Sequence, residues 1–88
     1  MYTLDSIIAL LDKHHQRATY GAVGAVVTRP PQSVMAGRQR SQTDSWIVSK
    51  KTKTPTGYPA HLIHPFLKER EHVINTEEEL VSWLAHHT

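Results

Sequence analysis

A run of small residues that ends at two consecutive prolines limits the fold of this chain more than any other feature. Glycine, alanine and valine fill the segment between Tyr20 and Val27, and Pro30-Pro31 follows. The prolines stop a regular element, because each lacks a backbone N–H and restricts the residue before it. Thr19 is a suitable N-cap, so we predict a short helix that a neighbouring helix can approach closely. Its two glycines and three valines leave a strand as the alternative.

The segment after the prolines predicts a third, shorter helix. Pro31 suits the first turn of a helix, Gln32–Ala36 can continue it, and Gly37 suits the position after its end. Two short helices joined by a tight turn are the parts of a helix-turn-helix unit. In such a unit Gln32 and Ser33 would reach base edges or phosphates, and simple capping of the helix is their alternative role.

Both ends of the chain carry amphipathic helix patterns. Near the start, Thr3 can cap a helix over residues 4–14, whose apolar face is formed by Leu4, Ile7, Ile8 and Leu11. Near the end, Thr76 and Glu79 have the spacing of a capping box. They precede an apolar face made of Leu80, Trp83 and Leu84.

The strand signals are short. Trp46-Ile47-Val48 is the best of them, the basic run from Lys50 to Lys53 reads as a hairpin tip, and any returning strand over residues 54–59 would be an edge strand. A helical turn over residues 64–70 and a strand at Val73-Ile74 are also expected. The pattern predicts an α+β fold: a small winged helix-turn-helix-like domain, mainly helical, with a short β-hairpin and an added C-terminal helix.

Length and composition exclude several classes of protein. A chain of 88 residues has room for one hydrophobic core, so residues 1–88 are predicted to form a single domain. The absence of cysteine excludes a disulfide scaffold, a thiolate zinc site and a cysteine nucleophile. No apolar run approaches the ~20 residues that span a bilayer, and no export signal is recognisable. We therefore expect no membrane association and a cytoplasmic location.

Charge is unevenly distributed along the chain. Residues 13–53 contain eight lysines and arginines and one acid, Asp44, whereas the other residues contain two basic and seven acidic side chains. Such segregation favours a polyanionic partner over part of the surface. The predicted third helix and hairpin place five cations beside one another, which suits phosphate contacts: Arg38, Arg40, Lys50, Lys51 and Lys53. An ordinary solvated loop is the alternative.

No pattern predicts a metal, a cofactor or a catalytic group. His61 and His64 are three residues apart, but a zinc site needs three or four converging ligands, and adjacent histidines on a helix point in different directions. Ser45 lacks the local setting of an activated nucleophile. We expect a protein without enzymatic activity.

Three segments together resemble a known family. Ala18-Thr19-Tyr20-Gly21-Ala22-Val23-Gly24-Ala25 is similar to the "TYGxxA" start of the helix-turn-helix in O6-alkylguanine-DNA alkyltransferases and alkyltransferase-like proteins. The spacing of Pro30 and Gly37 is similar to that of the family's "PxxARxVG" recognition helix. Ser45-Trp46-Ile47-Val48, followed by Gly57-Tyr58, is similar to its "PCHRVV…GGY" segment.

The resemblance implies a DNA-facing surface but no alkyl transfer. Ser45, or Trp46 in a register shifted by one residue, falls where alkyltransferases carry the reactive cysteine, and alkyltransferase-like proteins often carry tryptophan there. The resemblance also implies that Tyr20 contacts a DNA phosphate, with a structural anchor as the alternative. The family's arginine finger falls on Val34, which could wedge between bases or, as we prefer, pack in the core.

Two functions follow as expectations. The first is a non-enzymatic protein that grips duplex DNA through the basic helix-turn-helix and hairpin. The second is a small protein-interaction or adaptor module on the same fold. An apolar face with Trp46 and Tyr58 exposed would favour the second.

Overall fold

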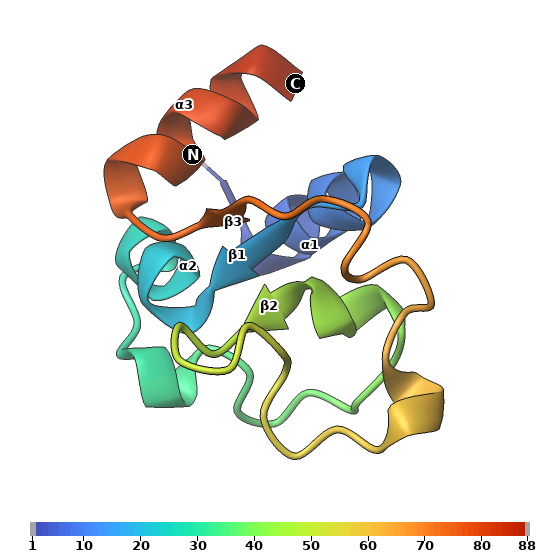
Figure 1. Cartoon of the computed structure of the whole chain (residues 1–88). Coiled ribbons are helices and arrows are strands. Elements are labelled where there is room, and N and C mark those ends of the chain that lie inside the picture. The colour runs from blue at the N-terminus through green and yellow to red at the C-terminus, as the bar shows by residue number, and fades with distance from the viewer. Residues whose placement is uncertain (1, 88) are drawn as a thin grey trace.

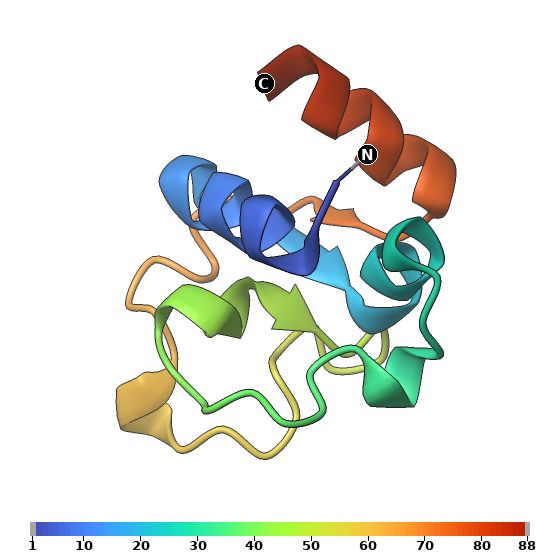
Figure 2. The same cartoon turned by 180° about the vertical axis from the view of Figure 1, so that it is seen from behind.

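The structure is a computed structural model that describes residues 2–87. It is an α+β fold, as predicted, with three helices, α1 (Leu4–His14), α2 (Tyr20–Val27) and α3 (Glu77–His87). They surround a sheet of three short strands, β1 (Arg17–Thr19), β2 (Ile47–Val48) and β3 (Val73–Ile74). Single 3-10 turns cover Pro31–Ser33, Thr43–Trp46 and Ala60–Leu62. Figures 1 and 2 show α3 on the β3 side of the sheet and long irregular segments on the β2 side.

The sheet is parallel, with β1 between β2 and β3. The predicted β-hairpin is therefore wrong. The basic run forms a turn, closed by hydrogen bonds from the Ser49 N–H to the Thr54 carbonyl (3.0 Å) and from the Lys53 N–H to the Ser49 carbonyl (2.7 Å). Residues 54–59 form no strand. Pro55 and Pro59 have no N–H for a ladder, which explains why the chain does not return beside β2.

The two terminal helices and the strand at β3 are confirmed. The Thr3 hydroxyl accepts a hydrogen bond from the Ser6 N–H at 3.1 Å and caps α1, and His15, directly after the last residue of α1, has a left-handed φ of 53°. At α3, the Thr76 hydroxyl accepts from the Glu79 N–H at 3.1 Å. Local patterns and caps therefore determine both helices.

The predicted helix-turn-helix is only half present. The helix reading of residues 20–27 is confirmed, with the Thr19 hydroxyl accepting from the Ala22 N–H at 3.1 Å. The prediction of a third helix after Pro30 is wrong. The chain makes one 3-10 turn over Pro31–Ser33 and then continues in turns through Gly37. Val34 lies in the core beside Gly24, and this packing takes the place of a regular helix. Residues 64–70, where a helical turn was expected, form hydrogen-bonded turns but no regular helix: the Leu67 N–H donates to the His64 carbonyl and the Glu69 N–H to the Phe66 carbonyl, each at 3.0 Å.

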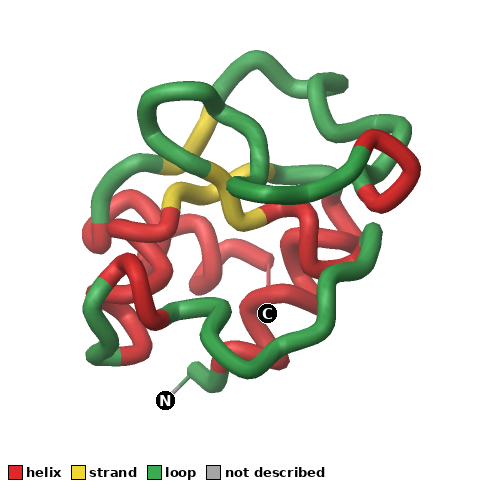
Figure 3. Tube along the Cα trace, turned by 90° about the horizontal axis from the view of Figure 1, so that it is seen from below, coloured by secondary structure: helices red, strands yellow, loops and turns green. Residues whose placement is uncertain are grey.

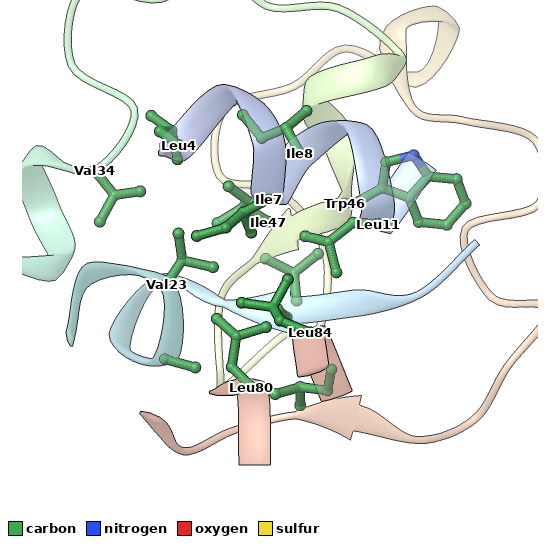
Figure 4. Close-up of a cluster of buried hydrophobic side chains, with 14 of the residues drawn as sticks. Leu4, Ile7, Ile8, Leu11, Val23, Val34, Trp46, Ile47, Leu80 and Leu84 are labelled. Atoms are coloured by element: carbon green, nitrogen blue, oxygen red, sulfur yellow. The ribbon is translucent and has the colours of Figure 1, made fainter. Parts of the chain in front are cut away.

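The core lies between the sheet and all three helices, as Figure 4 shows. α3 packs mainly on α2, whereas α1 packs on the 3-10 turn that ends at Trp46. Figure 3 shows how much of the remaining chain is loop. The buried apolar side chains are Leu4, Ile7, Ile8, Leu11, Ala18, Ala22, Val23, Val34, Trp46, Ile47, Val48, Leu67, Ile74, Leu80 and Leu84.

A histidine–tryptophan cluster joins the end of α1 to α3. The His14 ring lies 4.5 Å from the His87 ring and 5.7 Å from the Trp83 ring, measured between centroids, and Trp83 stacks on His87 at 4.3 Å. Burial, followed by repulsion from His87, Lys13 and Arg70, lowers the pKa of His14 below its usual value of 6.5. The folded protein therefore binds this proton less readily than the unfolded chain does.

We expect acidification to destabilise the fold through this cluster. Because the pKa of His14 is lowered on folding, its contribution is complete above 6.5 and is lost as the pH falls through that value toward the folded pKa. The melting temperature should fall as the pH is lowered through 6.5, and His14→Gln should reduce that fall. His61→Gln, at an exposed position, is the control. Identical pH profiles for the two variants would contradict the assignment.

Candidate nucleic-acid interface

Tyr20 joins the start of α2 to the segment after β2. It is the first residue of α2, and its half-buried ring carries the hydroxyl to the Thr56 N–H, from which it accepts a hydrogen bond at 3.0 Å. The side chain thus fixes residues 54–58 against the helix. This contact gives Tyr20 the role of a structural anchor, one of the two roles expected from the sequence. The hydroxyl hydrogen can still donate to a further partner.

A groove of about 540 Å³ opens beside this contact. Tyr20, Gln32 and Thr56 supply its polar groups, and Pro31, Met35 and Ala36 supply apolar walls. Two of the predicted site residues, Tyr20 and Gln32, therefore meet at one surface. Ser33 is half-buried and is not part of the groove lining, although it follows Gln32 directly.

Removing the Tyr20 hydroxyl should loosen this junction. Tyr20→Phe leaves the Thr56 N–H without its acceptor, so we expect a loss of about 0.5–1.5 kcal/mol in the free energy of unfolding. Amide hydrogen exchange at Thr56 should accelerate, while exchange in α1 should change no more than the global stability does. Tyr2→Phe, at another half-buried tyrosine, is the control. Unchanged exchange at Thr56 would show that the bond does not hold the segment.

The same segment reaches Arg40. The exposed guanidinium of Arg40 lies 5.9 Å from the centre of the Tyr58 ring. Burial raises the pKa of the Tyr58 hydroxyl, and the Asp44 carboxylate adds to this, so the phenol stays neutral. Gly57 has a φ of 73° and packs against the Arg40 side chain. A Cβ at this position would lie 3.0 Å from a guanidinium nitrogen of Arg40. Residues 54–58 therefore link the groove to an exposed cation.

The lysine turn, Lys50–Lys53, follows β2. All three of its lysines are exposed, and they form no ion pair with any residue from 2 to 87. The turn is nevertheless ordered, because the Lys53 carbonyl accepts a hydrogen bond from the Arg17 guanidinium at 3.0 Å. Its three ammonium groups thus stand on a fixed backbone with their charge available.

Arg38 differs from the other predicted cations. Its guanidinium donates to both carboxylate oxygens of Asp44, at 2.9 and 3.2 Å, and to Asp5 at 2.7 Å. The hydrogen bond to Asp44 is the main reason that the pKa of Arg38 is raised; burial opposes it, and the bond to Asp5 adds to it. Arg38 therefore clamps α1 to the Thr43–Trp46 turn, and its charge is already neutralised.

Val34 and Trp46 lie outside the interface: Val34 takes the core position preferred for it over a wedge between bases, and Trp46, at the place of the family's reactive residue, is buried as well. Both side chains are 0% exposed, so neither can touch DNA in this structure. The Trp46 indole N–H donates to Asp12 at 2.8 Å, and its ring stacks on His15 with centroids 5.3 Å apart. Ser45, the other residue at the position of the family's cysteine, is also buried, and its hydroxyl donates to the Gln42 carbonyl at 2.7 Å.

Arg17 is one of the eight cations of residues 13–53 but contributes to no exposed basic surface. It belongs to the basic segment, yet it is 5% exposed and lies in the central strand. Its guanidinium donates to the carbonyl oxygens of Lys53, Arg70 and Glu71. The sequence around Arg17 does not indicate whether its side chain is buried or exposed, because the carbonyls that it binds come from distant parts of the chain.

Within residues 2–87, no helix has the length and apolar character needed to cross a membrane. Across the same range, no three histidine or acidic side chains are grouped as a metal site would require. Comparisons with protein-family models, curated proteins and solved structures found no significant match to this chain.

Proposed function

We propose that this protein binds duplex DNA without catalysing a reaction. The observation that carries the proposal is the number of basic side chains that remain exposed in the folded protein. Of the eight cations in residues 13–53, Arg17 is buried and Arg38 is paired, and the other six are exposed. Asp44, the one acid of that segment, is buried against Arg38. Exposed cations of this density suit phosphate contacts.

The spatial arrangement supports the same function. The glutamates at the start of α3 lie on the β3 side of the sheet, whereas the loops that carry Arg40 lie on the β2 side (Figures 1 and 2). We assign the DNA face to the groove residues Tyr20 and Gln32, to Arg40 and to the lysine turn, with Ser33 at its margin. The resemblance of residues 18–25 to the alkyltransferase helix start is consistent with this face.

A protein-interaction module is the less favoured function. It required an apolar face with Trp46 and Tyr58 exposed. Trp46 is fully buried, and Tyr58 is half-buried beneath Arg40. The large aromatic residues that anchor protein interfaces are therefore not displayed at that position.

Salt dependence of binding tests the proposal. Fluorescence anisotropy with a labelled duplex should show log affinity falling linearly with log salt, with about 0.9 of slope for each phosphate contacted. Replacing Lys50, Lys51 and Lys53 with alanine should reduce that slope by about two to three. Lys13→Ala removes an exposed cation from the end of α1 and should leave the slope nearly unchanged. An unaltered slope in the triple variant would exclude the lysine turn from the interface, and absence of duplex binding would overturn the proposed function.

A further inference from the structure

A second cleft, of about 340 Å³, lies between the lysine turn and β3. Its lining includes Thr19, Lys50, Lys53, Glu71, His72 and Asn75. Side chains alternate along a strand, so Arg17 and Thr19 lie on the same face of β1. The cleft therefore stands over the face of the central strand that carries the buried arginine, separate from the groove beside Tyr20.

Arg17 holds the two walls of this cleft together. Its guanidinium donates to the Lys53 carbonyl on one wall at 3.0 Å and to the Glu71 carbonyl on the other at 3.4 Å. A third bond, to the Arg70 carbonyl at 2.8 Å, fixes the chain entering β3. The cleft is thus built by an internal clamp and does not depend on chance contact between two loops.

The charge of Arg17 has no counter-ion. Its partners are neutral carbonyls, it forms no ion pair with a carboxylate of residues 2–87, and its Nε has no hydrogen-bond partner. Burial lowers the pKa of Arg17, the direction expected for a charge removed from water without a partner. A buried charge of this kind is stabilised by a nearby ion of opposite sign.

The cleft lining offers what an anion needs. Lys50 and Lys53 add two ammonium groups at the rim, and Thr19 and Asn75 add a hydroxyl and an amide. One carboxylate, that of Glu71, lines the cleft, while the Glu79 carboxylate is paired with His72. Together with Arg17 beneath them, the lysines leave a net positive charge.

We propose that this cleft binds a phosphate group. The two ammonium groups and the polar donors of the lining, with the buried Arg17 guanidinium bonded to the carbonyls of both walls, match the oxygens of a phosphate, which form strong charge-assisted hydrogen bonds. The phosphate belongs either to a DNA backbone or to a small phosphorylated molecule, and the cleft accepts the same chemistry from both. The inference does not require the proposed DNA function, because the residues that carry it are those of the cleft alone.

A titration with inorganic phosphate tests the site. In ¹H–¹⁵N spectra recorded at constant ionic strength, the amides of Thr19, Lys50, Lys53 and Asn75 should shift saturably, with a Kd on the order of 1 mM. The double variant Lys50→Gln with Lys53→Gly should weaken binding by about tenfold or more. Glycine is used at position 53 because Lys53 has a φ of 61°, so the change removes the charge without backbone strain.

Lys51→Gln is the matched control. It removes one of the three positive charges of the same turn, but Lys51 is exposed and is not part of the cleft lining, so phosphate affinity should remain within about twofold of the parent. Shifts that do not saturate, or equal losses in the control and the double variant, would overturn the site. The spectra themselves report whether each variant is folded.

A short duplex added to the phosphate-saturated protein identifies the source. Displacement of phosphate from the cleft amides would assign the site to a DNA backbone phosphate. Retention of phosphate in a DNA complex would assign it to a small phosphorylated ligand. If the protein binds no duplex, the proposed function fails, and saturable phosphate binding at the cleft still supports this inference.

Discussion

Replacing Gly24 with alanine should lower the melting temperature by about 5–20 °C. A Cβ at this position would lie 2.5 Å from the Arg29 carbonyl oxygen and 3.1 Å from a methyl group of Val34. The carbonyl is backbone, and it cannot move freely because the Arg29 N–H donates to the Gly24 carbonyl at 2.8 Å. Overpacking of this kind costs about 1–3 kcal/mol, and each kcal/mol corresponds to roughly 4–8 °C in a domain of this size. Thermal unfolding followed by circular dichroism measures the effect.

Gly21→Ala is the control within the same helix. The nearest atom to a Cβ there is the Thr19 hydroxyl oxygen at 3.9 Å, and the position is exposed. Alanine is the better helix former by up to about 1 kcal/mol, so this variant should melt at the parent temperature or above it. A Gly24→Ala protein that melts with the parent would show that α2 does not pack closely on the Arg29–Val34 segment.

Replacing Trp46 with alanine should have an effect of similar or larger size. The side chain is the largest of the fully buried residues, and it contacts Asp12 of α1 and His15, the residue that follows α1. Truncating a buried tryptophan costs about 3–5 kcal/mol, which corresponds to roughly 20 °C here. The midpoint of urea unfolding provides a second measurement.

The other tryptophan provides the comparison for this prediction. Trp83 is half-buried on α3, where it contacts His14 and His87. Trp83→Ala should therefore cost clearly less than Trp46→Ala, because less apolar surface loses its contacts. Equal losses of stability in the two variants would contradict the full burial of Trp46, which is the reason for excluding it from the DNA interface.

Local information was sufficient for the two terminal helices and insufficient for the sheet. α1 and α3 each combine an apolar face with an N-cap threonine, and both signals lie within about a dozen residues. β1 has three residues, too few to show alternation, and its partners are distant in sequence. A hairpin was expected after Val48 because the basic run there is typical of a hairpin tip. The run instead forms a turn whose Lys53 carbonyl accepts a hydrogen bond from Arg17.

The residues of the candidate interface could be predicted where their neighbours in the sequence already indicate that they are exposed. Lysines in a short polar run and the glutamine after two prolines are exposed, as their neighbours suggest. Arg17 and Arg38 could not be separated from them, since the carbonyls and carboxylates that hold these two come from other parts of the chain. Val34 packs in the core, as its apolar character favoured, whereas the burial of Trp46 follows from tertiary contacts with α1 that its local sequence does not show.

The order of strands in the sheet also constrains how the chain folds. β1 is made early in the sequence, but one of its two neighbours comes from the middle of the chain and the other follows Glu71 and His72. Long loops must close before these pairings can form, and folds dominated by such distant contacts fold slowly for their size. During synthesis, the segment that contains α1, β1 and β2 leaves the ribosome without Ile74, Leu80 and Leu84, whose side chains complete its core. Until those residues emerge, the nascent chain exposes apolar surface that the finished fold buries, and a chaperone has access to it during that interval.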